Sequence, residues 1–402
     1  MLTEALLEDA RGIAERITAL RRAIHAEPEL GLDTPKTLAK VRAELADLPL
    51  EWREGPSCTG AVAVLNAGKA GRSLLLRGDM DALPMDEETG LAFASATPGR
   101  MHACGHDTHT AMLAGAARIL AGRAADLPGE VRFMFQPGEE GFHGARFMLD
   151  DGLLGGGESG PLPEAAFALH IMPNAPHGMI GSRAGTLLAS ADMLDIEVTG
   201  RGGHASMPHD TRDPVPVACE IVLALQTMVT RRFDAAEAVV VTITRLDAGT
   251  AHNVIPDRVQ LRGTIRTLTP DKRSGVAQAI RQVVENIAAA HDCTGAVTIT
   301  EGFPPTVNDA RAVALAEAVA TSLPDGAFMH MAAPIMGAED FSYVLAKVPG
   351  MMAFLGVAEA GADWRQCCAI HSNRMTVDEA VLPRGAAFLA GCAVRFLERG
   401  WD

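Results

Sequence analysis

The chain has 402 residues, of which 48% are hydrophobic and 21% are charged, a composition typical of a globular protein and not of a disordered or fibrous one. Its 35 Lys and Arg residues against 50 Asp and Glu residues give a formal net charge of −15, which argues against a nucleic-acid partner because such a partner requires a basic surface. A chain of this length usually forms two domains.

The sequence also argues against a membrane or secreted protein. No apolar run approaches the roughly 20 residues that a membrane-spanning helix needs. The N-terminal segment is charged and helix-patterned, unlike a signal peptide. The cysteines number seven, whereas a secreted disulfide framework usually has an even set at short spacings. We therefore expect a cytoplasmic protein with reduced thiols and no membrane partner.

The first predicted element is an amphipathic helix over residues 3–26, where apolar side chains recur at spacings of three, four and seven. Short apolar runs then alternate with helical patterns, which predicts an α/β domain with a largely parallel central sheet. The predicted strands are 61–65, 73–77, 131–135, 165–169 and 352–357, and predicted helices include 108–123 and 310–321.

Residues 184–300 follow a different order: strand, helix, two strands, helix and strand. This β-α-β-β-α-β order is typical of ferredoxin-like domains. We therefore expect an inserted domain, with residues 1–183 and 301–402 forming the α/β domain and two connections that permit hinge motion. The predicted elements of the insertion are strands 191–199, 238–245, 257–268 and 295–300 and helices 215–231 and 272–291.

Polar side chains follow the predicted strands of the α/β domain. Asp79 and Asp81 follow strand 73–77, Glu139 and Glu140 follow strand 131–135, and His170 follows strand 165–169. Ligands of open α/β sheets bind beyond the carboxyl ends of the strands, so we expect these side chains to lie at one site.

A short motif before a helix indicates a metal site. Cys104 and His106 lie on either side of a glycine, which lets a thiolate and an imidazole converge on one transition metal. If Cys104 bridges two metals, four terminal ligands give each metal three protein ligands, as in a catalytic centre with an open position. Glu139 is then left beside a ligand, where it can take a proton from water. The four terminal ligands of this hypothesis are His106, Glu140, His170 and His371.

Two other functions stay open on these residues alone. One is a cysteine hydrolase in which Cys104 acts with His106 or His109, and the other is a catalytically silent metal-binding or ligand-binding protein. The acidic groups nearby favour a metal over a free thiolate, and the complete set of candidate ligands with Glu139 argues against a silent protein. A chelator and a thiol alkylator would separate the first alternative from a metal site.

At these residues the sequence resembles the dinuclear metallopeptidase family that includes aminoacylases, hippurate hydrolase and the hydrolases of auxin–amino-acid conjugates. The matching motifs occur in order along nearly the whole chain, and their combination is specific although some are short. They include Arg77-Gly78-Asp79-Met80-Asp81, Met101-His102-Ala103-Cys104-Gly105-His106-Asp107, Gln136-Pro137-Gly138-Glu139-Glu140, Gly202-Gly203-His204, His252-Asn253-Val254-Ile255-Pro256 and Gly337-Ala338-Glu339-Asp340-Phe341.

The resemblance implies an α/β, phosphorylase/hydrolase-like catalytic domain and an inserted ferredoxin-like domain that acts as a lid and forms a homodimer, or a tetramer. It implies two divalent metals per subunit, with zinc or manganese favoured and cobalt or nickel compatible. The implied metal ligands are Cys104, His106, Glu140, His170 and His371. Glu139 is the implied base, Asp81 supports a ligand, His204 stabilises the oxyanion from the neighbouring subunit, and Asn253 and Arg266 bind the substrate carboxylate.

The implied activity is metal-dependent hydrolysis of the amide bond of N-acyl-amino acids, such as hippurate or N-acetyl-amino acids, to a carboxylic acid and a free amino acid. A dipeptidase or an N-acetyl-diaminopimelate-type deacetylase would use the same residues. The sequence departs from the family pattern around His371, in Ala369-Ile370-His371-Ser372-Asn373. This departure affects the expected acyl or amino-acid preference, not the expected reaction.

Overall fold

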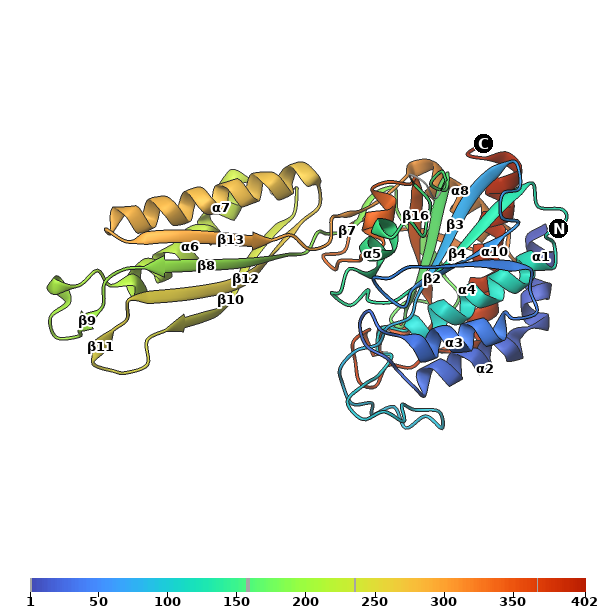
Figure 1. Ribbon diagram of the computed structural model, residues 1–402, viewed down its shortest axis with the longest axis horizontal. Helices are drawn as coiled ribbons and strands as arrows, with labels where there is room; N and C mark the ends of the chain where they lie inside the picture. The colour runs from blue at the N-terminus through green and yellow to red at the C-terminus, as the bar shows by residue number, and fades with distance from the viewer. Residues whose placement is uncertain (1, 157–159, 235, 367) are drawn as a thin grey trace. The chain divides into compact units, whose positions relative to one another are not determined.

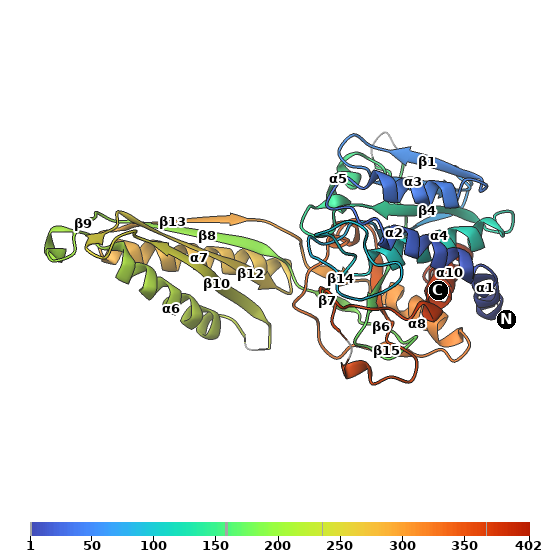
Figure 2. The same ribbon diagram turned by 90° about the horizontal axis from the view of Figure 1, so that it is seen from below.

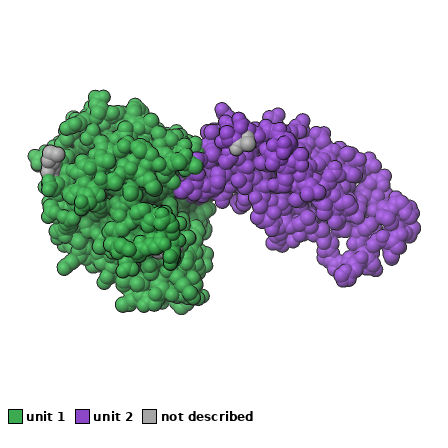
Figure 3. Space-filling view, turned by 180° about the vertical axis from the view of Figure 1, so that it is seen from behind, with its two compact units in different colours: residues 1–187, 307–333, 340–402 green, residues 188–306, 334–339 purple. Residues whose placement is uncertain are grey.

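The structure, a computed structural model, describes residues 2–156, 160–234, 236–366 and 368–402. These residues form two compact units (Figure 3): residues 1–187, 307–333 and 340–402 belong to the first unit, and residues 188–306 and 334–339 to the second. The chain leaves the first unit through β7 (Gly185–Leu188) and returns through β14 (Thr306–Asn308). The second unit overlaps the insertion expected at 184–300 and also takes in residues 334–339.

A mixed eight-stranded sheet forms the centre of the first unit, in the order β1-β2-β4-β3-β5-β16-β6-β15 (Figure 1). The four strands β4, β3, β5 and β16 pair in parallel, as expected, whereas β1, β2 and β6 join by antiparallel pairing. All residues of β4 are buried, which is typical of a central strand covered on both faces. The bounds are β1 (Leu50–Glu54), β2 (Ala61–Leu65), β3 (Arg72–Asp79), β4 (Gly129–Gln136), β5 (Ala165–Met172), β6 (Ile180–Ser182), β15 (Phe328–His330) and β16 (Gly350–Gly356).

Helices α1 (Leu2–Gly12), α2 (Ala14–His25), α4 (His106–Ala121) and α10 (Leu382–Arg399) pack together beside this sheet (Figure 1). The prediction of one helix over 3–26 is wrong in one respect: the helix is interrupted at Ile13, which leaves the helical backbone region directly after Gly12, a weak helix former. The remaining helices are α3 (Pro35–Glu44), α5 (Gly144–Asp150), α8 (Ala310–Ser322), α9 (Ser342–Leu345) and the short η3 (Trp364–Gln366) and η4 (Glu379–Val381).

One segment in the described part of the chain, Glu379–Arg399, is long and apolar enough to cross a membrane. However, 83% of its apolar window is buried inside the protein, where α10 contributes Phe388, Phe396 and Leu397 to the core of the first unit. This segment is therefore a core helix of the α/β unit.

The second unit has the expected ferredoxin-like order, with an antiparallel sheet β10-β12-β8-β13 (Figure 2). Leu194, Ile196 and Val198 of β8 point to the helices and are buried, whereas the residues between them face the other side. The two helices begin at the side-chain caps Asp213 and Thr269, each followed by proline. The elements are β8 (Asp192–Thr199), β9 (Gly203–His204), η2 (Pro208–Asp210), α6 (Pro214–Arg232), β10 (Val239–Ala248), β11 (Val254–Ile255), β12 (Arg258–Thr267), α7 (Pro270–Ala290) and β13 (Thr294–Thr300).

Candidate metal centre

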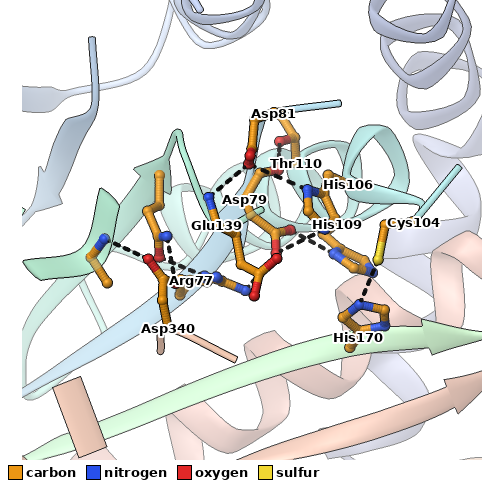
Figure 4. Close-up of polar contacts among 12 residues, drawn as sticks. Arg77, Asp79, Asp81, Cys104, His106, His109, Thr110, Glu139, His170 and Asp340 are labelled. Atoms are coloured by element: carbon orange, nitrogen blue, oxygen red, sulfur yellow. Dashed lines mark hydrogen bonds and ion pairs between the residues drawn. The ribbon is translucent and has the colours of Figure 1, made fainter. Parts of the chain in front are cut away.

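The candidate ligands of the first unit gather where its central strands end. β3, β4 and β5 are parallel, so their carboxyl ends lie at one edge of the sheet, and α4 begins at the same place with His106 as its first residue. His170 lies in β5, and Glu139 and Glu140 follow β4. Figure 4 shows His106, Glu139 and His170 lying together, and the ligand atoms of Glu140 lie within 4.8 Å of those of His106 and Glu139, so the expected meeting of these side chains is present.

Two of the overlapping sets of possible ligand atoms share Cys104. In one set, Cys104, His106 and His170 offer ligand atoms that all lie within 4.8 Å of one another, and the Cys104 Sγ atom is 3.4 Å from His170 Nε2. In a second set, Cys104, Glu140 and His371 meet the same criterion, with His371 Nε2 3.3 Å from Glu140 Oε1. A thiol common to two sets is the arrangement expected of a bridging ligand.

The residues present fit a metal pair. His106 Nε2 and Glu140 Oε1 are buried and have no hydrogen-bond partner, although such atoms are normally paired in folded proteins. They lie 3.9 Å apart and face the same space. One thiol, three imidazoles and a carboxylate form a donor set that suits transition metals such as zinc or manganese. A metal in this space would give both orphan atoms a partner.

The charges of the cluster are strongly coupled. Burial alone would lower the pKa of His106, but Asp79 and Cys104 attract the proton and raise that pKa well above its ordinary value. Contacts with Cys104 and Glu140 raise the pKa of His371 to about 10. Burial raises the pKa of the Cys104 thiol. Metal ligands must be deprotonated, so a cation binding here displaces protons from these groups.

Asp81 connects the ligand helix to the loop that carries the expected base. Its two carboxylate oxygens accept the backbone N–H groups of Glu139 and Glu140, each at 3.0 Å. Its Oδ1 atom also lies 3.4 Å from His106 Nδ1, too poorly aligned for a hydrogen bond, so Nδ1 lacks a hydrogen-bond partner as Nε2 does. Asp81 thus lies behind a candidate ligand, where the resemblance puts it, and it fixes the backbone of Glu139, which is 7% exposed.

His371 reaches the cluster from a distant loop by an unusual backbone conformation. Its φ is 66°, in the left-handed region that non-glycine residues rarely adopt. Its backbone N–H donates to the carbonyl of Ala103 at 2.7 Å, directly before Cys104. The side chain is 52% exposed, unlike the other candidate ligands, so this ligand lies at the solvent side of the cluster.

His109 does not fit the role in a cysteine hydrolase that the sequence left open for it. Its Nε2 atom accepts the Ile171 N–H at 2.8 Å, and its Nδ1 lies 2.6 Å from Asp79 Oδ1. Both ring nitrogens are therefore engaged, so His109 can neither bind a metal nor take a proton from Cys104. The contact between His109 and Asp79 joins residues 30 positions apart, and the only sign of it in the sequence is the position of Asp79 at a strand end.

The other predicted site residues belong to the second unit. His204 in β9 pairs with Val254 in β11, and Ala205 N–H donates to the Asn253 carbonyl, so His204 and Asn253 lie on one short ribbon. This ribbon lies where β8 ends and β12 begins, since Gly200 N–H donates to the Asp257 carbonyl. Arg266 lies near the other end of β12.

The spacing along β12 keeps Arg266 apart from the ribbon. Eight residue steps separate Arg258 from Arg266 in this strand, which spans about 26 Å at about 3.3 Å per residue. Thr267, next to Arg266, exchanges backbone and side-chain hydrogen bonds with Ser190, near the start of the unit. Within one chain, Arg266 and His204 therefore lie at opposite ends of the sheet of the second unit.

Comparisons with known proteins agree along nearly the whole chain. Residues 75–395 match the model of the peptidase family M20/M25/M40. IAA-amino acid hydrolase ILR1-like 2 of Arabidopsis thaliana is 38% identical over 98% of this chain and 88% of its own length. N-acetylcysteine deacetylase of Bacillus subtilis is 37% identical, over 95% and 97%. The crystal structure of the Bacillus subtilis YXEP protein, a dinuclear metal binding peptidase from the M20 family, has a TM-score of 0.84 and 34% identity, covering 97% of this chain and 99% of that one.

Proposed function

The chain belongs to the peptidase family M20/M25/M40 and is a hydrolase of amide or peptide bonds. From this premise we propose that it cleaves the amide bond of N-acyl-amino acids at a dinuclear metal centre. The observation that carries the proposal is Cys104, whose thiol is common to two sets of candidate ligands. The similar proteins named above include a hydrolase of auxin conjugates and a deacetylase of N-acetylcysteine, both of which have N-acyl-amino-acid substrates by name.

In this proposal His106 and His170 would hold one divalent cation, Glu140 and His371 would hold the second, and Cys104 would be a ligand of both. Two such cations would lower the pKa of a water molecule and polarise the scissile carbonyl. Zinc and manganese suit the thiolate and carboxylate ligands, and cobalt or nickel are compatible with the same set.

Glu139 acts as the general base. Its carboxylate belongs to a set with His106 and Glu140 whose ligand atoms lie within 4.8 Å of one another, so it lies directly beside the proposed ligands. The hydrogen bond from its backbone to Asp81 fixes its loop. Glu139 takes the proton of the attacking water and then delivers it to the leaving amine, so one carboxylate serves both proton transfers.

We also propose that each active site of a homodimer uses residues from both subunits. A small substrate cannot contact Arg266 and His204 of the same chain, because about 26 Å of strand separates their ends of the lid sheet. If both act on one substrate, one of them comes from a partner subunit. Arg266 then binds the amino-acid carboxylate as a planar fork. The partner's lid supplies His204, which donates a hydrogen bond to the oxyanion, and also Asn253, which binds the carboxylate with Arg266.

A substrate panel tests this function. Zinc- and manganese-loaded protein is assayed with N-acetyl-, N-benzoyl-, indoleacetyl- and long-chain N-acyl-amino acids, with unmodified dipeptides, and with N-acetyl-diaminopimelate. We expect hydrolysis of N-acyl-amino acids with a free carboxylate. We expect much lower rates when that carboxylate is converted to a carboxamide, because Arg266 requires the carboxylate. Preference for dipeptides would instead favour the dipeptidase function, and turnover of N-acetyl-diaminopimelate alone would favour the biosynthetic deacetylase.

The free state of the cysteine thiols is consistent with a reducing compartment. Cys58, Cys104, Cys219, Cys293 and Cys392 are not in disulfide bonds. A bridging Cys104 has to stay reduced to bind metal, since the thiolate is the ligand. We therefore propose a reducing, cytoplasmic location.

A further inference from the structure

We propose that Asp79 and His109 form a positioning pair that sets the affinity of one of the two metals, the one held by Cys104, His106 and His170. The inference deepens the proposed function and rests on it, since it assumes that this ligand set binds a metal. Neither residue is a ligand in the proposal. They act by fixing the orientation of His170 and by placing a negative charge beside His106.

The hydrogen bonds of His109 determine which of its nitrogens carries the proton. A backbone N–H can only donate, so the Ile171 N–H that lies 2.8 Å from His109 Nε2 makes this nitrogen an acceptor. The proton of a neutral ring is then on Nδ1, which donates to Asp79 Oδ1 at 2.6 Å. His109 therefore connects β5 through its Nε2 atom and β3 through its Nδ1 atom.

Asp79 is firmly anchored at the end of β3. Its Oδ2 atom accepts from Arg77 Nη1 at 2.6 Å, and its backbone carbonyl accepts from the Thr110 hydroxyl of α4 at 2.6 Å. Arg77 is held in turn by Gln136 and Asp340, at 2.9 and 3.1 Å. Figure 4 shows this buried group of side chains extending to the candidate ligands. Asp79 is completely buried, so its position and charge are fixed by these partners.

The pair contacts the surroundings of both histidines in one ligand set. The backbone of Ile171 is bound at both of its polar groups: its N–H donates to His109, and its carbonyl accepts from His170 Nδ1 at 2.7 Å. This leaves His170 Nε2 unprotonated and directed at Cys104 Sγ, 3.4 Å away. Asp79 Oδ2 lies 3.5 Å from His106 Nε2, and both ring nitrogens of His106 lack a hydrogen-bond partner. A carboxylate at this distance favours a cation on that nitrogen.

The second ligand set has no such support from the pair. The backbone N–H of Glu140 donates to Asp81, and the backbone N–H of His371 donates to the Ala103 carbonyl. Loss of the Asp79 charge should therefore weaken one metal-binding step and spare the other. A role in folding alone would lower stability without this selectivity.

The test is an equilibrium competition for Zn²⁺ between the full chain and a chromophoric chelator, resolved into two binding steps. Asp79→Asn keeps the size of the side chain and removes its charge. The matched control is Glu130→Gln, since Glu130 is a buried carboxylate in the same sheet that pairs with Arg132 at 2.6 Å and belongs to no ligand set. We expect Asp79→Asn to weaken one step by about 10- to 100-fold and the control to change neither step.

A second variant covers the case in which Asp79→Asn fails to fold. His109→Gln can still accept the Ile171 N–H but cannot donate to Asp79 at the same time, and we expect it to weaken the same step. Two unchanged steps, or an equal loss in both, would overturn the positioning role. Two other results would instead overturn the proposed metal centre: binding of fewer than two Zn²⁺ by the wild type, or retention of both Zn²⁺ by the His106→Ala variant. The two failures are therefore distinguishable.

Discussion

The backbone of Gly105 passes so close to Ile171 that a Cβ atom on residue 105 would lie 2.5 Å from Ile171 Cγ1. Gly105 also has a φ of 85°, in the left-handed region that side chains disfavour, and it is the N-cap residue of α4. Glycine therefore lets the chain turn between Cys104 and His106 while β5 stays in contact with the turn. The convergence of these two candidate ligands depends on the missing side chain.

Gly105→Ala should separate the two ligands. Left-handed backbone costs alanine about 1–2 kcal/mol, and the contact with Ile171 adds a steric cost. We expect lower stability in denaturant unfolding and Zn²⁺ content below that of the wild type in metal analysis. Gly90→Ala is the control, because Gly90 has a similar φ of 70° but open space around its Cβ position. Equal Zn²⁺ content in both variants would contradict the role of the close approach.

A buried charge network ties α2 to the first turn of α4. Arg21 Nε donates to Asp107 Oδ2 at 2.7 Å, and His25 contacts Asp107 through Nδ1 at 2.9 Å and Glu87 through Nε2 at 3.2 Å. Burial alone would lower the pKa of His25, but attraction to Asp107 and hydrogen bonds to Asp107 and Glu87 raise it to about 9. His25 is thus a buried cation at neutral pH.

This network predicts a pH dependence of stability. The pKa of His25 is about 9 in the folded chain and about 6.5 when unfolded, so the folded state binds more protons between these values. The stabilisation is complete below about pH 6.5 and is lost as pH rises through about 9, with a slope of at most about 1.4 kcal/mol per pH unit. Denaturant unfolding with chelator present should show this fall, and His25→Gln should flatten it. A control, His330→Gln, changes an exposed histidine that contacts Glu317 at 2.9 Å, and an equal flattening there would count against the assignment.

The inserted domain should fold on its own. Its β8, β12, α6 and α7 bury a separate core that includes Leu194, Ile221, Leu261 and Ile280. Residues 188–306, expressed alone, should therefore unfold cooperatively without metal in a calorimeter or by circular dichroism. A noncooperative product would contradict the separate domain, provided that a variant extended to 184–310 behaves in the same way.

Mixed dimers test whether His204 acts across the subunit interface. Glu139→Gln and His204→Ala subunits should each be nearly inactive alone. After exchange, each mixed dimer contains one site with both changes and one site with neither. Random pairing makes about half of the dimers mixed, so about a quarter of all sites should regain activity. If mass spectrometry verifies exchange and the activity stays at the level of the separate variants, His204 acts within its own subunit.

The sequence was sufficient to predict most of the fold from local patterns, whereas the gathering of the five candidate ligands was predicted from their places after strands and from the family resemblance. Strand β2 occurs at residues 61–65 as predicted, and Cys104 and His106 are neighbours in the sequence. The partners of His25 and His109 could not be predicted, because they come from distant segments: His25 and Asp107 are 82 residues apart, and His109 and Ile171 are 62 apart. The pairing of β12 with β8, which puts Arg266 and His204 at opposite ends of the sheet, could not be predicted from local patterns either.

The central claim is that metal binding and proton transfer belong to different side chains of one cluster, and Glu139→Gln tests it most directly. The variant keeps the shape of Glu139 and its backbone hydrogen bond to Asp81. Metal content and the rate of N-acyl-amino-acid hydrolysis are measured on the same preparation, beside His106→Ala. We predict that Glu139→Gln holds two metals per chain, as the wild type does, and loses about 10²- to 10⁴-fold in rate, whereas His106→Ala loses metal. Substantial turnover by Glu139→Gln, or loss of its metals, would contradict the account.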